Sequence, residues 1–258
     1  MVQVCAIASG SNGNCYYIAN NEDAILVDAG ISCKQILKRM SEKNLDLNKV
    51  KALFISHEHS DHIRGVDVFI KQTQIPIYMS KGTYNNSKLK LDKSLINFIS
   101  DNSITEIGNL KVTAFSKIHD ASEPLSFMID NEGKLISVLT DIGEVCDNVK
   151  FAVQRSNVIF MESNYDKDML DSGPYPYFLK QRISGGEGHL SNLQASALLM
   201  SHASSNLDLV LLSHLSDKNN DPNLALKAFD DIQHLREDLN YDLVITDRFD
   251  AIDPINLD

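Results

Sequence analysis

Short apolar runs rich in Val, Ile and Phe alternate with amphipathic helical patterns along most of the chain. This rhythm is typical of α/β proteins, in which helices connect the strands of a sheet. In the first third we predict strands at Val2–Ser9, Cys15–Ala19, Ala24–Asp28, Ala52–Ser56 and Ile75–Met79, helices at Lys34–Lys43 and Val66–Gln72, and a polar loop at His57–His62.

The middle of the chain is rich in strands, and helical patterns return after it. The pattern predicts strands at Ile104–Ile107, Leu110–Ser116, Leu125–Ile129, Leu135–Thr140, Val158–Met161, Leu209–Leu212 and Leu243–Thr246, and helices at Leu193–His202 and Leu224–Leu235. So many strands favour two sheets over one. Because no linker rich in Pro, Gly or Ser divides the 258 residues, we expect a single domain over 1–258.

Composition narrows the class of protein. With 43% hydrophobic and 23% charged residues, the chain is globular and not disordered or collagen-like. Its four cysteines form no C-x-x-C pair, which is typical of a reducing compartment. No Lys or Arg precedes the apolar run at the N-terminus, and no window has the length of a membrane span. We therefore expect a cytoplasmic protein that does not enter a membrane.

The net charge is -11, which excludes a uniformly basic surface. It does not exclude a nucleic-acid substrate, since bound cations and local patches set the field that a phosphate meets. The stretch from Lys71 to Lys93 contains five lysines and one acidic residue. Two interpretations stay open for it: a solvated face, which is the common case, or a rim that follows a nucleic-acid backbone.

The strongest chemical signal is the segment Ser56-His57-Glu58-His59-Ser60-Asp61-His62, which directly follows a predicted buried strand. Alternate residues of such a loop face one ion while the next acid and imidazole face a second, so H-x-H-x-D-H suits a site for two metal ions. Three further candidate ligands each follow a predicted strand: His119, Asp141 and His214. Taken singly each has an ordinary structural explanation, but together with the loop they complete a ligand set.

This ordered series resembles the ligand series of the metallo-β-lactamase superfamily, and the resemblance implies a four-layer αββα sandwich of two mixed sheets flanked by helices. It also implies a division of the ligands. His57, His59 and His119 would bind one ion, Asp61, His62 and His214 the other, and Asp141 would bridge the two. Zinc suits the histidine-rich shell, and the two carboxylates also admit manganese.

Further motifs resemble the YycJ/WalJ-like branch of this superfamily, whose members are metal-dependent nucleases acting on DNA ends. The motifs are Ser9-Gly10-Ser11-Asn12-Gly13-Asn14, His119-Asp120-Ala121, Thr140-Asp141-Ile142-Gly143, Glu162-Ser163-Asn164, Gly188-His189-Leu190-Ser191-Asn192 and His214-Leu215-Ser216. Tyr165 departs from the branch, which places His after Glu-Ser-Asn. No long arm resembles that of tRNase Z.

The glycine-rich segment Gly185–Gly188 precedes His189 and a helix for which Ser191 is a plausible N-cap. One interpretation is a capped turn. The other is an active-site loop, because His189 occupies a place that resembles the His-Ser/Thr segment of tRNase Z, and it implies that His189 contacts the scissile phosphate or protonates the leaving oxygen. Glu162 either steadies a ligand imidazole or faces solvent.

Together these features predict a hydrolase that uses two divalent ions, Zn²⁺ or Mn²⁺, to cleave phosphodiesters of a nucleic acid, DNA before RNA. Asp61 and Asp141 would orient the attacking water, and His189 would assist the leaving group. The alternatives are a tRNA 3′-processing ribonuclease, a thioester, lactone or β-lactam hydrolase of the same superfamily, and a metal-binding module without catalysis.

Overall fold

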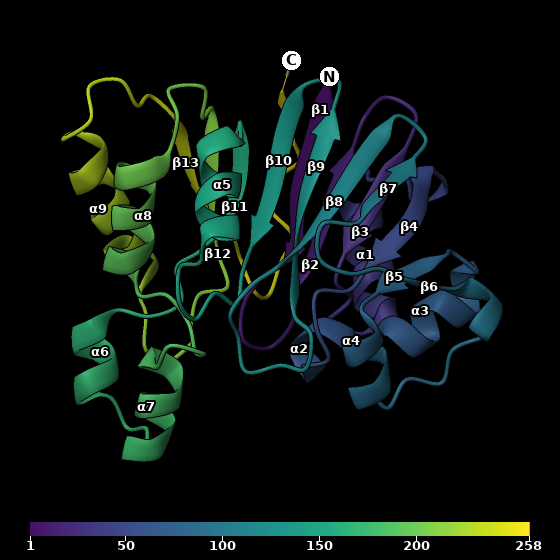
Figure 1. The fold of residues 1–258 in the computed structure, drawn as a ribbon, viewed down its shortest axis with the longest axis horizontal. Coiled ribbons are helices and arrows are strands. Elements are labelled where there is room, and N and C mark those ends of the chain that lie inside the picture. The colour runs from purple at the N-terminus through teal and green to yellow at the C-terminus, as the bar shows by residue number, and fades with distance from the viewer. Residues whose placement is uncertain (258) are drawn as a thin grey trace. The chain divides into compact units, whose positions relative to one another are not determined.

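The computed structural model describes residues 1–257 (Figure 1). The strands belong to two mixed β-sheets flanked by helices, which confirms the predicted fold class. The chain divides into two compact units. The first consists of Met1–Ser116, Ala121–Lys134 and the segment from Thr246 onward, and the second of Lys117–Asp120 and Leu135–Ile245.

In the first unit, one sheet has the strand order β14-β1-β2-β3-β4-β5-β6. Its strands are β1 (Val2–Ala8), β2 (Cys15–Ala19), β3 (Ala24–Val27), β4 (Val50–Phe54), β5 (Ile77–Met79), β6 (Ile96–Phe98) and β14 (Ile255–Leu257). The pairs β1/β2 and β2/β3 are antiparallel, whereas β3/β4, β4/β5 and β5/β6 are parallel. The parallel pairing brings the carboxyl ends of β3 and β4 to the same edge of the sheet, and the histidine-rich loop begins at this edge.

Three further strands of the first unit, β7 (Ile104–Ile107), β8 (Leu110–Ser116) and β9 (Leu125–Asn131), pair in antiparallel order. The helical segments of this unit are α1 (Cys33–Glu42), η1 (Leu47–Lys49), α2 (Ser60–Ile63), α3 (Val66–Thr73), α4 (Lys81–Asn86) and η2 (Lys93–Leu95). In α1, the hydroxyl of Ser32 caps the first turn by accepting from the backbone N–H of Gln35. Ile36 and Met40, four residues apart, then fall on the buried face of the helix against the sheet.

In the second unit, β10 (Lys134–Leu139), β11 (Val158–Glu162), β12 (Leu209–Ser213) and β13 (Asp242–Ile245) pair in parallel, each with the next. Leu139 is opposite Met161, and Glu162 is opposite Ser213. The carboxyl ends of these strands therefore lie in register at one edge, which is where functional groups gather in parallel sheets.

Among the described residues, the second unit contains five helices: α5 (Asp147–Arg155), α6 (Lys167–Ser172), α7 (Tyr177–Ser184), α8 (Asn192–His202) and α9 (Pro222–Gln233). The helix α8 packs against α5 and α9. It begins with a capping box, in which Ser191 and Gln194 exchange side-chain and backbone hydrogen bonds. Figure 1 shows α6 and α7 together, beyond α8 and α9.

Each predicted strand and helix is present within a few residues of its expected bounds. The sequence missed the short strands β6 and β14, because three residues show no periodicity and their hydrogen bonds come from β5 and β1. It also missed α4, α5, α6 and α7. The predicted loop at His57–His62 is wrong in its second half, where α2 begins at Ser60. Among residues 1–257, every helix falls short of the length and apolar character needed to cross a membrane.

Candidate metal centre

The histidine-rich segment of the first unit leaves β4 and turns into α2. His57 and His62 are fully buried, and His59 and Asp61 are partly buried. The ring of His57 lies 4.6 Å from that of His59 and 4.1 Å from that of His62, measured between centroids. The sequence-predicted ligands of this unit are thus gathered in one place. Burying so many polar rings together is unfavourable unless each finds a partner.

Asp28, at the end of β3, anchors this cluster. Its carboxylate accepts from the backbone N–H and the hydroxyl of Ser56, each at 2.8 Å, and lies 2.7 Å from Nδ1 of His62. The amide Nδ2 of Asn14, which only donates, lies 3.3 Å from Nε2 of His62. Nδ1 of His62 therefore carries the proton and Nε2 accepts from Asn14, so a metal bound at Nε2 would take the place of this amide contact. The sequence analysis did not single out Asp28, although a carboxylate ending an apolar strand parallel to β4 is a usable signal.

Gly30 makes the close approach between the β3 edge and α2 feasible. A Cβ at this position would lie 1.6 Å from the carbonyl oxygen of Asp61. The backbone N–H of Asn14 donates to the same oxygen at 2.8 Å, and the N–H of Ala29 donates to the carbonyl of His62 at 2.9 Å. The backbone of Asp61 and His62 is therefore held against Asn14 and the β3–α1 connection, and only glycine fits at position 30.

In the second unit, the predicted ligands follow the carboxyl ends of the parallel strands. Asp141 comes two residues after β10 and His214 directly after β12, and both have a left-handed backbone with φ of 57°. Non-glycine residues in this conformation are uncommon and gather at functional sites. His119 lies in the segment Lys117–Asp120, where its side chain is almost fully buried.

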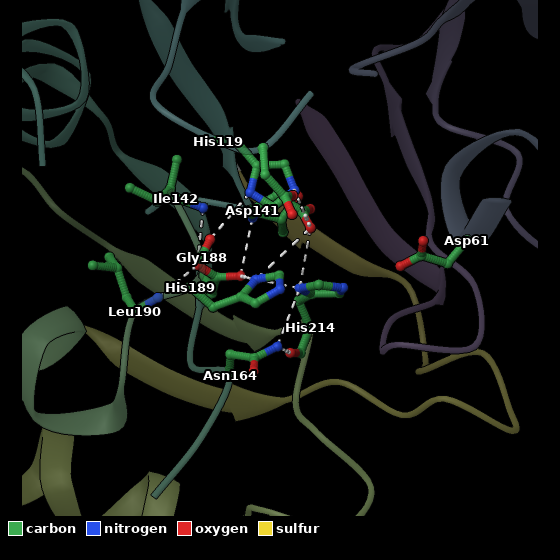
Figure 2. Close-up of polar contacts among 12 residues, drawn as sticks. Asp61, His119, Asp141, Ile142, Asn164, Gly188, His189, Leu190 and His214 are labelled. Atoms are coloured by element: carbon green, nitrogen blue, oxygen red, sulfur yellow. Dashed lines mark hydrogen bonds and ion pairs between the residues drawn. The ribbon is translucent and has the colours of Figure 1, made fainter. Parts of the chain in front are cut away.

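These side chains converge (Figure 2). Oδ1 of Asp141 lies 3.7 Å from Nε2 of His119, 3.6 Å from Nδ1 of His214 and 3.9 Å from Nδ1 of His189. The ring of His189 lies 5.3 Å from that of His119 and 5.2 Å from that of His214. The structure therefore brings together all four residues that the sequence singled out in this unit.

Glu162, the last residue of β11, lies beneath this cluster and is fully buried. Its carboxylate accepts from the backbone N–H groups of Asp141, Ile142 and Leu190 at 2.9–3.0 Å. Nδ1 of His189 lies 2.9 Å from Oε1 of Glu162, and Nδ1 of His214 lies 3.0 Å from the same oxygen. Burial acts to raise the pKa of Glu162, but attraction to His189 and the hydrogen bonds from both rings outweigh burial and lower the pKa to about 2.

Because ionised Glu162 only accepts, both imidazoles must donate from Nδ1, and Nε2 is the nitrogen that carries the lone pair in the neutral ring. With its oxygens occupied by five donors, Glu162 orients two candidate site residues, His189 and His214. This answers the alternative left open by the sequence, in which Glu162 either steadied an imidazole or faced solvent. The sequence could not decide between these alternatives, because the hydrogen-bond partners of Glu162 lie at least 20 residues away along the chain.

His119 is held in the same way, since its Nδ1 lies 3.1 Å from the carbonyl oxygen of Gly188, which accepts the proton. Burial lowers the pKa of His119 to about 4, partly offset by the nearby charge of Asp141. The ring is therefore neutral at pH 7. A neutral imidazole with Nε2 available is the form that binds divalent metals.

The donor set fits a divalent metal. In the second unit, Oδ1 of Asp141 lies within 3.7 Å of a ring nitrogen of His119 and of His214, and Glu162 supports the cluster from beneath. Buried imidazoles with Nδ1 anchored on a carboxylate or a carbonyl, beside further carboxylates, are typical of zinc and other divalent metal sites. Both clusters are of this kind.

The remaining residues from the sequence analysis have clear places. Ser191 caps α8 as predicted. Tyr165 is buried, and its hydroxyl contacts Gln194 of the capping box at 3.5 Å, which is a structural role. The lysines between Lys71 and Lys93 are exposed. Their exposure agrees with the solvated face and does not decide between the two interpretations.

Comparison with known proteins places this fold and these clusters in context. Residues 8–130 match the family model of the metallo-β-lactamase superfamily. Over 85% of its length, the chain is 33% identical to the exodeoxyribonuclease YycJ of Bacillus anthracis, covering 84% of that protein. The chain is 34% identical to the exodeoxyribonuclease WalJ of Streptococcus pneumoniae, over 85% of its own length and 83% of the length of WalJ. Ribonuclease J 1 of Streptococcus pyogenes is 29% identical over 54% of this chain and 29% of its own length.

Solved structures agree on the fold. The metallo-β-lactamase fold protein YhfI of Bacillus subtilis has a TM-score of 0.75 at 16% identity, over 98% of this chain and 99% of its own. Zn²⁺-bound PqqB of Methylobacterium extorquens has a TM-score of 0.74 at 14% identity, over 100% of both chains. At these identities the likeness concerns the fold alone.

The fold and the two His/Asp clusters are thus those of a metallo-β-lactamase-fold protein. The identity of 33–34% to two relatives, over more than four fifths of their lengths, is more specific, and the chain belongs to the YycJ/WalJ-like branch of the metallo-β-lactamase superfamily. This confirms the resemblance inferred from the motifs.

Proposed function

We propose that the protein is a metal-dependent phosphodiesterase that removes nucleotides from the ends of DNA. The observation that carries this proposal is the identity of 33–34%, over 85% of the chain, to two exodeoxyribonucleases. The anchored histidine and carboxylate clusters supply the chemistry that such a reaction needs. The partial likeness to a ribonuclease J favours RNA as the second candidate substrate.

We further propose that residues 1–258 form one domain and that the two clusters together hold two divalent ions, Zn²⁺ or Mn²⁺. His57, His59 and His119 would hold the first ion, Asp61, His62 and His214 the second, and Asp141 both. Such ions, when bound, lower the pKa of water and offset the charge of the phosphate. The anchors of Nδ1 in His62, His119 and His214 support this assignment because they direct Nε2 to the ions.

The residues themselves would carry the proton transfers. Asp61 and Asp141 orient the attacking water and accept its proton as the bond to phosphorus forms. His189, whose Nδ1–H is held by Glu162 at 2.9 Å, would in its doubly protonated form donate the proton of Nε2 to the departing oxygen as the bond from phosphorus to that oxygen breaks. The arrangement resembles the way in which a carboxylate fixes the tautomer of a catalytic histidine in hydrolases.

The test uses end-labelled single- and double-stranded DNA and RNA, with Mn²⁺ or Zn²⁺ and with a chelator. We expect metal-dependent shortening of DNA from an end and weaker cleavage of RNA. Asp141→Ala is expected to lower kcat by at least 100-fold, since it removes a ligand and a proton acceptor at once. Parallel assays with bis(p-nitrophenyl) phosphate, a thioester and a β-lactam cover the superfamily alternatives. Turnover of the thioester alone would overturn the proposal.

A further inference from the structure

The helix α7 and the residues before it expose aromatic side chains. The segment Pro174-Tyr175-Pro176 leads into α7. The first two residues of the helix, Tyr177 and Phe178, are 76% and 73% exposed. Within α7, whose eight residues are all described, none is buried. Single exposed apolar residues are ordinary, but two adjacent rings on an unburied helix have no packing role in this unit.

This helix is joined directly to the candidate catalytic loop. The backbone N–H of His189 donates to the carbonyl of Ile183 in the last turn of α7 at 2.8 Å, and the N–H of Gly188 donates to the carbonyl of Gly185 at 2.9 Å. A Cβ at Gly188 would lie 2.2 Å from the carbonyl oxygen of Ile183. The loop therefore folds back tightly on α7, and the aromatic residues and His189 belong to one continuous, hydrogen-bonded piece of structure.

A second link fixes α7 to another predicted ligand. Nε of Arg182 lies 2.6 Å from Oδ2 of Asp120, the residue after His119, and the N–H of Asp120 donates to the carbonyl of Glu187 at 3.0 Å. Two contacts therefore hold α7 to the cluster of the second unit. One is made by the backbone of His189 and the other by Asp120, next to His119. A ligand that contacts the start of α7 is consequently placed relative to His119 and His189.

The spacing suits a polymer. An α-helix rises about 1.5 Å per residue, so the eight residues of α7 span about 12 Å. Stacked bases of one strand repeat about every 3.4 Å, so this span equals roughly three to four nucleotides. Flat aromatic rings bind unpaired bases by stacking, which tolerates any base sequence.

We propose that Tyr177 and Phe178 form a stacking platform for unpaired bases of a single-stranded nucleic-acid end whose scissile phosphodiester lies at His189. This inference rests on the proposed function and adds a substrate feature to it, a preference for single-stranded over fully paired ends. A membrane surface or a second copy of the chain fits less well, since neither accounts for the direct connection of the platform to His189.

The local charges sharpen the inference. Nζ of Lys180 donates to the carbonyl of Asp171 at 2.7 Å, and Arg182 is paired with Asp120, so both cations of α7 are engaged. Arg182 is neutralised by Asp120 and Lys180 is the one unneutralised cation of α7, so we expect stacking to contribute more than phosphate contacts at this platform. Binding by phosphate contacts weakens steeply with salt, whereas the contribution of stacking to the affinity persists.

The experiment compares the wild type with the double variant Tyr177→Ala/Phe178→Ala. KM and kcat are measured with Mn²⁺ on an end-labelled single-stranded DNA oligonucleotide, and again on the same oligonucleotide with abasic sites near the cleaved end. We expect KM for the normal oligonucleotide to rise roughly 100-fold in the double variant, about tenfold for each ring, at low and at high salt, with a smaller change in kcat. On the abasic oligonucleotide, the wild type and the double variant should have similar KM values.

Two controls separate stacking from general damage. Phe151→Ala removes an aromatic residue of α5 that is 52% exposed and should leave KM unchanged. Tyr177→Phe/Phe178→Tyr keeps both rings and should restore the wild-type KM. Circular dichroism and the melting temperature show whether each variant is folded.

The outcomes distinguish the two proposals. If the wild type cleaves DNA and the double variant has the same KM, the platform is wrong and the proposed function stands. If the wild type cleaves no nucleic acid, both fail. Loss of binding to anionic lipid vesicles in the double variant, with KM for DNA unchanged, would identify a membrane contact and overturn the platform.

Discussion

At the scale of single residues, the chemistry depends on which nitrogen of each imidazole is anchored. His62 is held by Asp28, His119 by the carbonyl of Gly188, and His189 and His214 by Glu162. These anchors set the tautomer in advance and leave Nε2 for the metal or the substrate. The sequence shows the histidines, whereas their partners lie far along the chain.

Glu162→Gln tests this scheme. The carboxylate of Glu162 accepts five hydrogen bonds through its two oxygens. Glutamine keeps the volume but replaces one oxygen by an NH₂ group, so the buried N–H groups that donated to that oxygen would face another donor. We expect metal affinity to fall about 10- to 100-fold and the free energy of unfolding to fall by about 2–4 kcal/mol. Titration calorimetry with Zn²⁺ and urea denaturation measure the two effects. Glu106→Gln, at an exposed position of β7, is the matched control, and equal metal affinity in both variants would refute the role of Glu162.

At the scale of elements, strand direction decides where functional groups meet. Asp141, Glu162 and His214 gather because β10, β11 and β12 are parallel and in register. In the first unit, the parallel pair β3/β4 brings Asp28 beneath Ser56 and His62. The β3–α1 connection must then pass against α2, and no space is left for a Cβ at Gly30.

Gly30→Ala tests this contact. A Cβ would lie 1.6 Å from the carbonyl oxygen of Asp61, so the backbone carrying Asp61 and His62 must move. We expect a loss of stability of about 2–4 kcal/mol and weaker metal binding, because ligand geometry tolerates little displacement. Gly186→Ala is the control for stability, since its Cβ would meet only the carboxylate of Glu144, at 3.8 Å. A melting temperature of the Gly30→Ala protein equal to that of the control would contradict this account.

At the scale of the whole molecule, the buried charges couple stability to pH. In the metal-free protein, burial lowers the pKa of His119 from 6.5 to about 4. Between these values the unfolded chain binds a proton that the folded protein does not, so stability falls as pH decreases from about 6.5 to 4. Glu162, with its pKa lowered from 4.5 to about 2, acts in the same direction at lower pH.

We therefore expect chelator-treated protein to lose on the order of 3 kcal/mol of unfolding free energy through His119 between pH 6.5 and pH 4. Urea denaturation at several pH values measures the slope. His119→Gln keeps a donor for the carbonyl of Gly188 but does not titrate, so its slope should be smaller by this amount. Identical slopes for the two proteins would show that His119 does not contribute.

Much of the fold and part of the site follow from sequence because they depend on near neighbours. The apolar strands, the capped helix at Ser191 and the segment His57–His62 each carry their signal within a few residues. Short edge strands such as β6, and the exposed helix α7, carry no such signal. The hydrogen bonds of β6 come from β5, and α7 has no fully buried residue to mark an apolar face.

By itself, the sequence determined which side chains are available and that they follow strands, because periodicity and adjacency are local properties. Only the tertiary structure decided how they are used. Asp28 and Glu162 become anchors because parallel pairing brings strand ends together from distant positions. Asp141 and His214 adopt left-handed backbones, which Asp and His tolerate better than most residues but which are uncommon enough that local sequence does not predict them. Hydrogen bonds between residues remote in sequence depend on the folded backbone, and they set the direction in which each imidazole presents its lone pair.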